Sequence, residues 1–195
     1  MRRWASLLLF LFAAICIWQG GWIETKAWLA QRLISHAWER SESTKDRIRP
    51  WSWADTWPVA RLSVPRLDVE RIILSGVSGR TLAFGPGWVE QTMLPGGAGR
   101  SVIVGHRDTH FRFVQNLVSG DQLVVQSPDG SETEYRISET AVVQENATWL
   151  LEPTSDRELL LITCYPFESI IPGGDLRFVV KAQAETVFPQ GGKSG

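Results

Sequence analysis

The segment Leu160–Pro166, LLITCYP in one-letter code, is an apolar run that ends at a cysteine, a tyrosine and a proline. A short apolar run closed by turn residues is typical of a buried β-strand. Similar runs recur from Pro58 onward, separated by glycine, proline and aspartate. We therefore expect strands at Val59–Val64, Val69–Leu74, Ser101–Val104, Gln122–Gln126, Thr133–Ser138, Glu158–Thr163 and Leu176–Val180.

Short strands at this spacing, with few helix candidates between them, favour an all-β domain, either an antiparallel barrel or a sandwich. The tetrapeptide Ser127–Gly130 (SPDG) is a strong turn signal between two of the strands. A chain of 195 residues has room for one such domain and an additional N-terminal segment. With 20 basic against 21 acidic residues and no basic run, nucleic acid is not an expected partner.

The N-terminal segment predicts a membrane anchor. The run Trp4–Ile23 carries no charged side chain and has the length that a helix needs to cross a bilayer. Arg2 and Arg3 precede it, which favours a cytoplasmic N-terminus. A cleaved signal peptide is the alternative, but no clear small-residue cleavage site follows the run. We expect a retained single-pass anchor with the rest of the chain outside the cytoplasm.

Between the anchor and the strands, Glu24–Arg40 contains neither glycine nor proline and is expected to be a helix. Its apolar stripe, which includes Trp28 and Trp38, can lie on the membrane surface or pack on the domain; we favour the juxtamembrane position. The predicted organisation is the anchor at residues 1–23, a juxtamembrane helix and linker at 24–57, the catalytic domain at 58–184, and a flexible tail at 185–195.

Cys164 is the first residue that indicates chemistry. The other cysteine, Cys16, lies in the membrane run, so the two cannot pair. A lone thiol outside the cytoplasm is a liability unless it is a buried apolar side chain or has a function. Two further segments resemble its setting: His106 follows the apolar strand that ends at Val104, and Arg177 follows the glycine turn before the last strand.

Cysteine, histidine and arginine together suit acyl transfer. A free thiol has a pKa of about 8.5, so little of it is the nucleophilic thiolate at neutral pH. A neighbouring histidine can take the thiol proton, because its own charge changes near neutrality. Attack on an amide carbonyl builds an oxyanion, and an arginine such as Arg177 is a permanent donor for it. No cofactor and no metal are needed.

Two other functions are compatible with these residues. His106, Asp108 and His110 alternate along the chain, and with Cys164 they could ligate zinc in a metal-dependent hydrolase. Three ligands along one strand make poor tetrahedral geometry, which disfavours that alternative. The second is a non-catalytic, membrane-tethered binding barrel, which would not require a reactive thiol.

These motifs resemble those of the sortase family. Pro95–Gly97 followed by Gly105–Asp108 is similar to the segment around the sortase histidine, and Leu161–Cys164 resembles the TLxTC motif, with Leu160 in place of its first threonine. Arg177, thirteen residues after Cys164, matches the sortase arginine. The likeness covers Val59–Ala182, nearly the whole extracytoplasmic domain. It is greatest to the sortases of Gram-negative, largely marine, proteobacteria.

The resemblance implies an eight-stranded β-barrel with short helices and a cysteine transpeptidase (a thiol protease or hydrolase when water is the acceptor). Such an enzyme cleaves an LPxTG-like C-terminal sorting signal through a thioester and transfers the product to an amine or water. Cys164 would be the nucleophile, His106 the acid and base, and Arg177 the donor to the oxyanion. Thr163 and Asp108 would contact the substrate. We expect an inner-membrane protein whose catalytic domain faces the periplasm.

Overall fold

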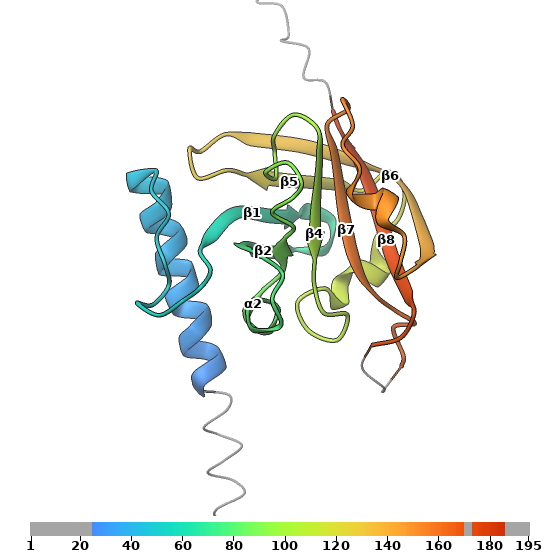
Figure 1. The fold of residues 1–195 in the computed structure, drawn as a ribbon. Helices are drawn as coiled ribbons and strands as arrows, with labels where there is room; N and C mark the ends of the chain where they lie inside the picture. The colour runs from blue at the N-terminus through green and yellow to red at the C-terminus, as the bar shows by residue number, and fades with distance from the viewer. Residues whose placement is uncertain (1–24, 170–172, 186–195) are drawn as a thin grey trace, which may run out of the picture.

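The computed structural model describes residues 25–169 and 173–185. Eight strands close into a barrel in the order β1-β2-β3-β4-β7-β8-β6-β5 (Figure 1). The strands are β1 (Pro58–Val64), β2 (Val69–Ser75), β3 (Gly87–Trp88), β4 (Arg100–Val104), β5 (Gln122–Gln126), β6 (Glu132–Gln144), β7 (Glu158–Tyr165) and β8 (Leu176–Ala184). The short helices are η1 (Pro65–Leu67), α2 (Gly79–Phe84), η2 (Arg112–Asn116) and η3 (Thr148–Leu151). The expected eight-stranded barrel is confirmed, and the sandwich alternative is wrong.

All seven expected strands are present, and the turn after β5 forms as expected. Gly130 N–H donates to Ser127 O at 2.9 Å, which closes the β5–β6 hairpin. Two expectations need correction. β6 and β8 extend well past the predicted ends at Ser138 and Val180, and β3 was not predicted because two residues are too short to show a pattern.

The barrel is mixed rather than antiparallel. β2 pairs with β3 and β4 pairs with β7 in parallel, while the other neighbouring strands are antiparallel. The β4–β7 pair joins segments that are separated in the chain by the whole β5–β6 hairpin. Such a pairing requires a long crossover connection, which local sequence does not reveal.

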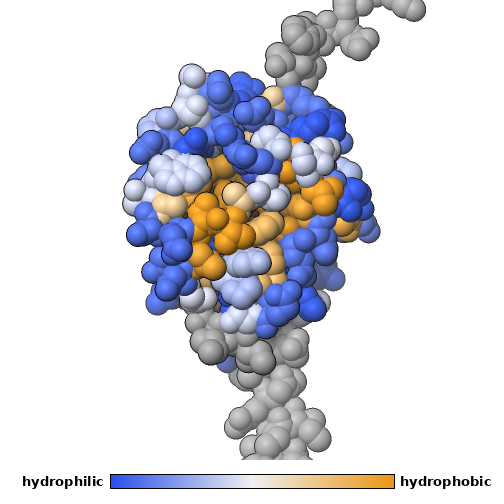
Figure 2. Space-filling view, turned by 90° about the vertical axis from the view of Figure 1, so that its right-hand side faces the viewer, coloured by the Kyte–Doolittle hydropathy of each residue, from blue (hydrophilic) through white to orange (hydrophobic). Residues whose placement is uncertain are grey.

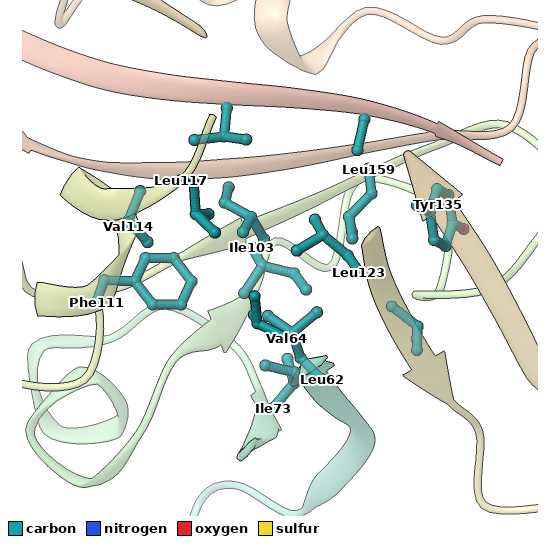
Figure 3. Packing of buried hydrophobic residues seen from close by; sticks show 14 of the residues in the cluster. Leu62, Val64, Ile73, Ile103, Phe111, Val114, Leu117, Leu123, Tyr135 and Leu159 are labelled. Atoms are coloured by element: carbon teal, nitrogen blue, oxygen red, sulfur yellow. The ribbon is translucent and has the colours of Figure 1, made fainter. Parts of the chain in front are cut away.

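The interior of the barrel is a continuous hydrophobic core (Figure 3). On β7, Leu159 and Leu161 belong to this core, whereas Leu160 and Ile162 belong to a second cluster outside it. Successive side chains of a strand point to opposite faces, so β7 presents apolar residues to both sides. The second cluster lies on the outer surface of β4, β7 and β8, where η3 packs.

The described part of the chain begins in a helix that ends at residue 44 and flanks the barrel (Figure 1). Ile34 and Trp38 are buried, and the Arg61 guanidinium of β1 lies 5.3 Å from the centre of the Trp38 ring. Trp28 remains exposed. The helix therefore packs on the domain through one part of its apolar stripe only.

No helix within residues 25–169 and 173–185 is long and apolar enough to cross a membrane. The predicted anchor, residues 1–23, and nearly all of the predicted tail lie outside the described residues.

Candidate active site

The parallel pairing of β4 with β7 brings the turn that carries His106 to the end of β7 that carries Cys164. The last paired residues are Val104 and Ile162. Beyond them, Gly105 N–H donates to Ile162 O at 3.1 Å, and the Thr163 hydroxyl donates to Gly105 O at 2.7 Å. His106 and Cys164 are the residues that follow these bonded positions in the two segments.

The chain leaves β4 through a turn that requires glycine at position 105. A Cβ atom at Gly105 would lie 2.6 Å from the Phe111 ring, and Phe111 is fully buried in the barrel core. Phe111 N–H donates to His106 O at 3.0 Å, which closes the turn. The turn is therefore held by the core, while the His106 side chain remains exposed.

Cys164 and Arg177 are directly opposite each other in the antiparallel β7–β8 ladder. Directly opposed residues of an antiparallel pair project to the same face, with Cβ atoms about 4.5–5.5 Å apart. The preceding outward pair is Ile162 with Val179, both part of the outer hydrophobic cluster. Cys164 is half-buried and belongs to this outer face, at the end of an apolar strip.

Three neighbouring groups hold the Arg177 guanidinium. Nη2 lies 2.8 Å from a carboxylate oxygen of Glu145, the residue after β6. Nη1 donates to the carbonyls of Gly174 at 2.5 Å and Leu176 at 3.0 Å. Within residues 25–169 and 173–185, the printed acceptors of this guanidinium bind Nη1 and Nη2 and not Nε–H. A guanidinium carries five such donors in a rigid plane.

Beside these residues lies the outer hydrophobic cluster, which is buried at its centre and partly exposed at its margin. Val89, Val102, Leu150, Leu160, Ile162 and Val179 are its buried members, with Val104, Val143 and Ala147 at its margin. Figure 2 shows a hydrophobic patch, framed by hydrophilic residues, on the face at the right-hand side of Figure 1. A pocket of about 50 Å³ lies in this surface, with Trp149 of η3 on its rim. The patch suits an extended peptide with apolar side chains.

A buried charge network holds η3 against the barrel. Glu158 is almost fully buried and lies 2.9 Å from Arg100 Nε and 3.0 Å from Lys181 Nζ. Burial alone would raise the pKa of Glu158, but the hydrogen bonds from Lys181 and Arg100 outweigh it and hold the pKa below its ordinary value. Arg100 Nη1 also donates to Trp149 O at 2.8 Å, so the network fixes the wall of the hydrophobic surface.

The two predicted substrate contacts differ in their placement. Asp108 is exposed in the turn after His106. Thr163 is 1% exposed, and its hydroxyl is bonded to Gly105 O. The geometry thus gives the Thr163 side chain a structural role between β4 and β7, and the predicted substrate contact through this hydroxyl has no support from it.

The alternative zinc site is not formed. No three His, Cys, Asp or Glu side chains within residues 25–169 and 173–185 come together as metal ligands. His110 Nε2 lies 3.4 Å from Ala83 O in α2. Burial, above all, lowers the pKa of His110 below its ordinary value, and the charges of Arg71 and His106 act in the same direction.

Sequence reasoning missed Glu145 and Arg107. Glu145 contacts Arg177 from a loop, and nothing in the local pattern distinguishes it from other surface acids. Arg107 follows His106 directly, but its burial was not predictable because charged side chains are rarely buried.

Comparison with known proteins agrees with this architecture. The family model for the sortase domain matches residues 62–185. Sortase D of Bacillus subtilis (strain 168) is 32% identical over 126 residues, which cover 64% of this chain and 63% of that protein. The chain therefore spans less than two thirds of that relative's length.

Solved structures show the same barrel. Sortase A from Corynebacterium diphtheriae superposes with a TM-score of 0.61 at 27% identity, over 71% of this chain and 65% of that one. A sortase D5 transpeptidase from Clostridium perfringens superposes with a TM-score of 0.66, over 81% and 99%. At 20% identity the latter shows the fold alone. Since the family model covers more than half of the chain, this protein belongs to the sortase family.

Proposed function

We propose that this protein cleaves a C-terminal, LPxTG-like sorting signal of a partner protein and transfers the new carboxyl terminus to an amine or to water. The single observation that carries the proposal is the pairing of Cys164 with Arg177, with His106 at the end of the adjacent strand. This pairing supports the assignment of a nucleophile, a proton carrier and a cationic donor to one end of the barrel.

In the first half of the reaction, the Cys164 thiolate attacks the carbonyl carbon of the threonine in the signal. The C–S bond forms, and the oxyanion accepts hydrogen bonds from Arg177. The peptide C–N bond then breaks as His106, in its imidazolium form, gives its proton to the departing amine. The product is a thioester on Cys164.

In the second half, an amine or a water molecule attacks the thioester. His106, now neutral, removes the proton from the attacking group, and the Cys164 thiolate leaves. Arg177 donates hydrogen bonds to the second oxyanion from the same position. The strand ends hold the three groups on a rigid frame, as a preorganised site requires.

The hydrophobic surface beside Cys164 supports a peptide substrate. Val104, Val143 and Ala147 are its partly exposed residues, and they cover the buried cluster that includes Ile162 and Val179. An extended sorting signal that carries leucine and proline would bury apolar side chains there, with its scissile carbonyl beside Cys164. Asp108, exposed next to His106, is proposed as a further substrate contact.

We further propose that residues 1–23 anchor the protein in the inner membrane, with the barrel in the periplasm. The uncharged run Trp4–Ile23 after Arg2 and Arg3 supports this orientation. The resemblance of the sequence to the sortases of Gram-negative marine proteobacteria is part of the same proposal and is consistent with this location. Protease protection in spheroplasts tests the topology: an exposed barrel is expected, and a barrel that is protected until the membrane is lysed contradicts it.

The experiment that tests the activity uses the full chain in detergent with an LPxTG-type peptide and intact-protein mass spectrometry. A mass increase equal to the N-terminal peptide fragment is expected on the wild type and not on Cys164→Ala. A chelator should not change it. Added amines should convert the adduct into a transpeptidation product.

Three results would contradict the proposal. Cleavage that persists in Cys164→Ala would remove the thiol from the mechanism. Cleavage that a chelator abolishes would favour the metal-dependent hydrolase instead. The absence of both cleavage and adduct with a panel of motif variants would favour a binding barrel without catalysis.

A further inference from the structure

We propose that Arg107 is a positioning residue that clamps the β7–β8 loop to the turn that carries His106. The described residues of this loop are 166–169 and 173–175. The proposal rests on the proposed function, because it assigns Arg107 a role in aligning His106 with Cys164 and Arg177.

The first observation is that the Arg107 side chain is buried, although it lies in the turn that follows β4. Arg107 is 7% exposed, although its neighbours His106 and Asp108 are both exposed. Removing a guanidinium from water is unfavourable unless its donors find acceptors. The acceptors that bind the Arg107 guanidinium therefore indicate which segments this buried side chain holds together.

Those acceptors lie on the β7–β8 loop. Nη2 donates to Ser169 O at 2.9 Å, and Nη1 approaches Gly173 O at 3.5 Å. These two carbonyls stand on either side of residues 170–172. One planar guanidinium thus joins both branches of the loop to the residue that follows His106. Hydrogen bonds from a charged donor are stronger than neutral ones.

The second observation is that Arg177 is bonded to the next residue of the same loop. Arg177 Nη1 donates to Gly174 O, so consecutive carbonyls, at Gly173 and Gly174, are held by Arg107 and Arg177. Both glycines have positive φ angles, +84° and +102°, which let successive peptide groups turn toward different donors. The loop is therefore fixed from the His106 side and from the Arg177 side at once.

This arrangement relates the three functional residues to one another. β4 defines where His106 leaves the sheet, and the β7–β8 ladder sets Cys164 opposite Arg177; the loop that follows Tyr165 connects these two strands beside the His106 turn. A misplacement of about 1 Å can lower a rate about 100-fold. Arg107 is the contact that ties the returning loop to the histidine turn, and lysine, with its single ammonium, cannot span two carbonyls as a fork.

The test compares full-length wild type with Arg107→Gln, Arg107→Lys and the control Arg112→Gln. Arg112 lies on η2 in the same connection, but its side chain is exposed. Two quantities are measured on each protein: hydrogen exchange along the chain, and kcat and KM for the sorting peptide. Circular dichroism confirms that each variant is folded at the assay temperature.

We expect Arg107→Gln to raise amide exchange at Ser169, Gly173 and Gly174 by about tenfold, with the β5–β6 hairpin unchanged. We expect kcat to fall about tenfold while KM changes less than about twofold, because alignment rather than binding is lost. Arg107→Lys should lie between wild type and Arg107→Gln. Arg112→Gln should match the wild type in both quantities.

Unchanged exchange in the loop, or a kcat equal to that of Arg112→Gln, would overturn the clamp. A uniform rise of exchange over all strands would also overturn it, since this would mean that Arg107 only stabilises the fold. If Arg107→Gln does not fold, the hydrogen exchange and the kcat of Arg107→Lys decide whether the clamp exists. If the wild type cleaves no peptide, the proposed function fails while the exchange data still decide the clamp.

Discussion

Arg177 on β8 stands directly opposite Cys164 on β7, and its guanidinium is tied on the other side to Glu145, just after β6. β7 and β8 thus contribute the opposed pair Cys164 and Arg177, while Glu145 reaches the guanidinium from beyond the end of β6, where Val143 is the residue opposite Arg177. The backbone ladder determines the spacing of Cys164 and Arg177, and the ion pair with Glu145 directs the guanidinium.

Replacing Arg177 by lysine should lower the rate of acyl-enzyme formation about 100-fold or more, the usual effect of losing one oxyanion donor. Lysine keeps the charge but not the planar fork. Single-turnover mass spectrometry measures the rate. Arg136→Lys serves as the control, because it is the same substitution at an exposed residue of β6 that lies opposite Gln183, near the other end of β8. An equal loss in both variants would contradict the assignment.

Replacing Glu145 by glutamine should lower kcat by a few fold. The Glu145–Arg177 pair is partly exposed, and exposed ion pairs contribute about 0.2–1 kcal/mol. Glutamine still accepts a hydrogen bond but no longer attracts the guanidinium. The kinetics are measured at low and high salt, and the difference between the variant and wild type should shrink as salt rises.

Glu152→Gln, an exposed change after η3, is the matched control for Glu145. A rise of kcat in Glu145→Gln would mean that Glu145 withholds Arg177 from the substrate instead of orienting it.

Replacing Gly105 by alanine should destabilise the protein by about 1–3 kcal/mol, because the new Cβ would overlap the buried Phe111 ring. The same displacement should move His106 and lower kcat. Urea unfolding measures the stability. Gly79→Ala is the control, because no atom lies within 4 Å of a Cβ there and alanine suits the helix α2; equal unfolding midpoints for the two variants would refute the packing argument.

The stability of the domain should fall in acid, in part through Asp121. Its carboxylate accepts from Arg66 Nη2 at 2.7 Å, and this hydrogen bond holds the pKa of Asp121 below its ordinary value. A lowered pKa in the folded state means that the stabilisation is present above the unfolded pKa. It is lost as pH falls through the folded pKa.

Asp121→Asn should therefore be less stable than wild type at pH 7, and the difference should vanish toward low pH. Urea unfolding from pH 7 to pH 3 measures both curves. Glu158, whose pKa is also held down, keeps some acid sensitivity in the variant. A wild-type advantage that is independent of pH would show that Asp121 does not act through its ionisation.

Much of the barrel was predictable because strands are encoded locally. Alternating or continuous apolar runs and the SPDG turn identified seven of the strands, and the ends of two of them supplied His106 and Cys164. β3 was not predicted, because a strand of two residues shows no periodicity. The parallel β4–β7 pair escaped because it joins segments far apart in the chain.

For the helix at residues 25–44 as well, the sequence predicted the secondary structure but not the packing. The absence of glycine and proline predicted the helix, but its apolar stripe fits a membrane surface as well as a protein surface. Burial of Ile34 and Trp38 against the barrel, with Trp28 left exposed, is decided by packing. An amphipathic pattern predicts that one face of the helix is covered, but it does not identify the surface that covers it.

By itself, the sequence determined the strands, the turns and the three residue types of the site, since each depends on neighbours within a few positions. Tertiary structure alone decided that Cys164 faces Arg177, that Thr163 turns inward to Gly105, and that Arg107 is buried beneath the loop. Register and burial depend on contacts between segments distant in the chain. Those contacts form only when the barrel closes, because closure leaves each strand two definite neighbours and each side chain one of two faces.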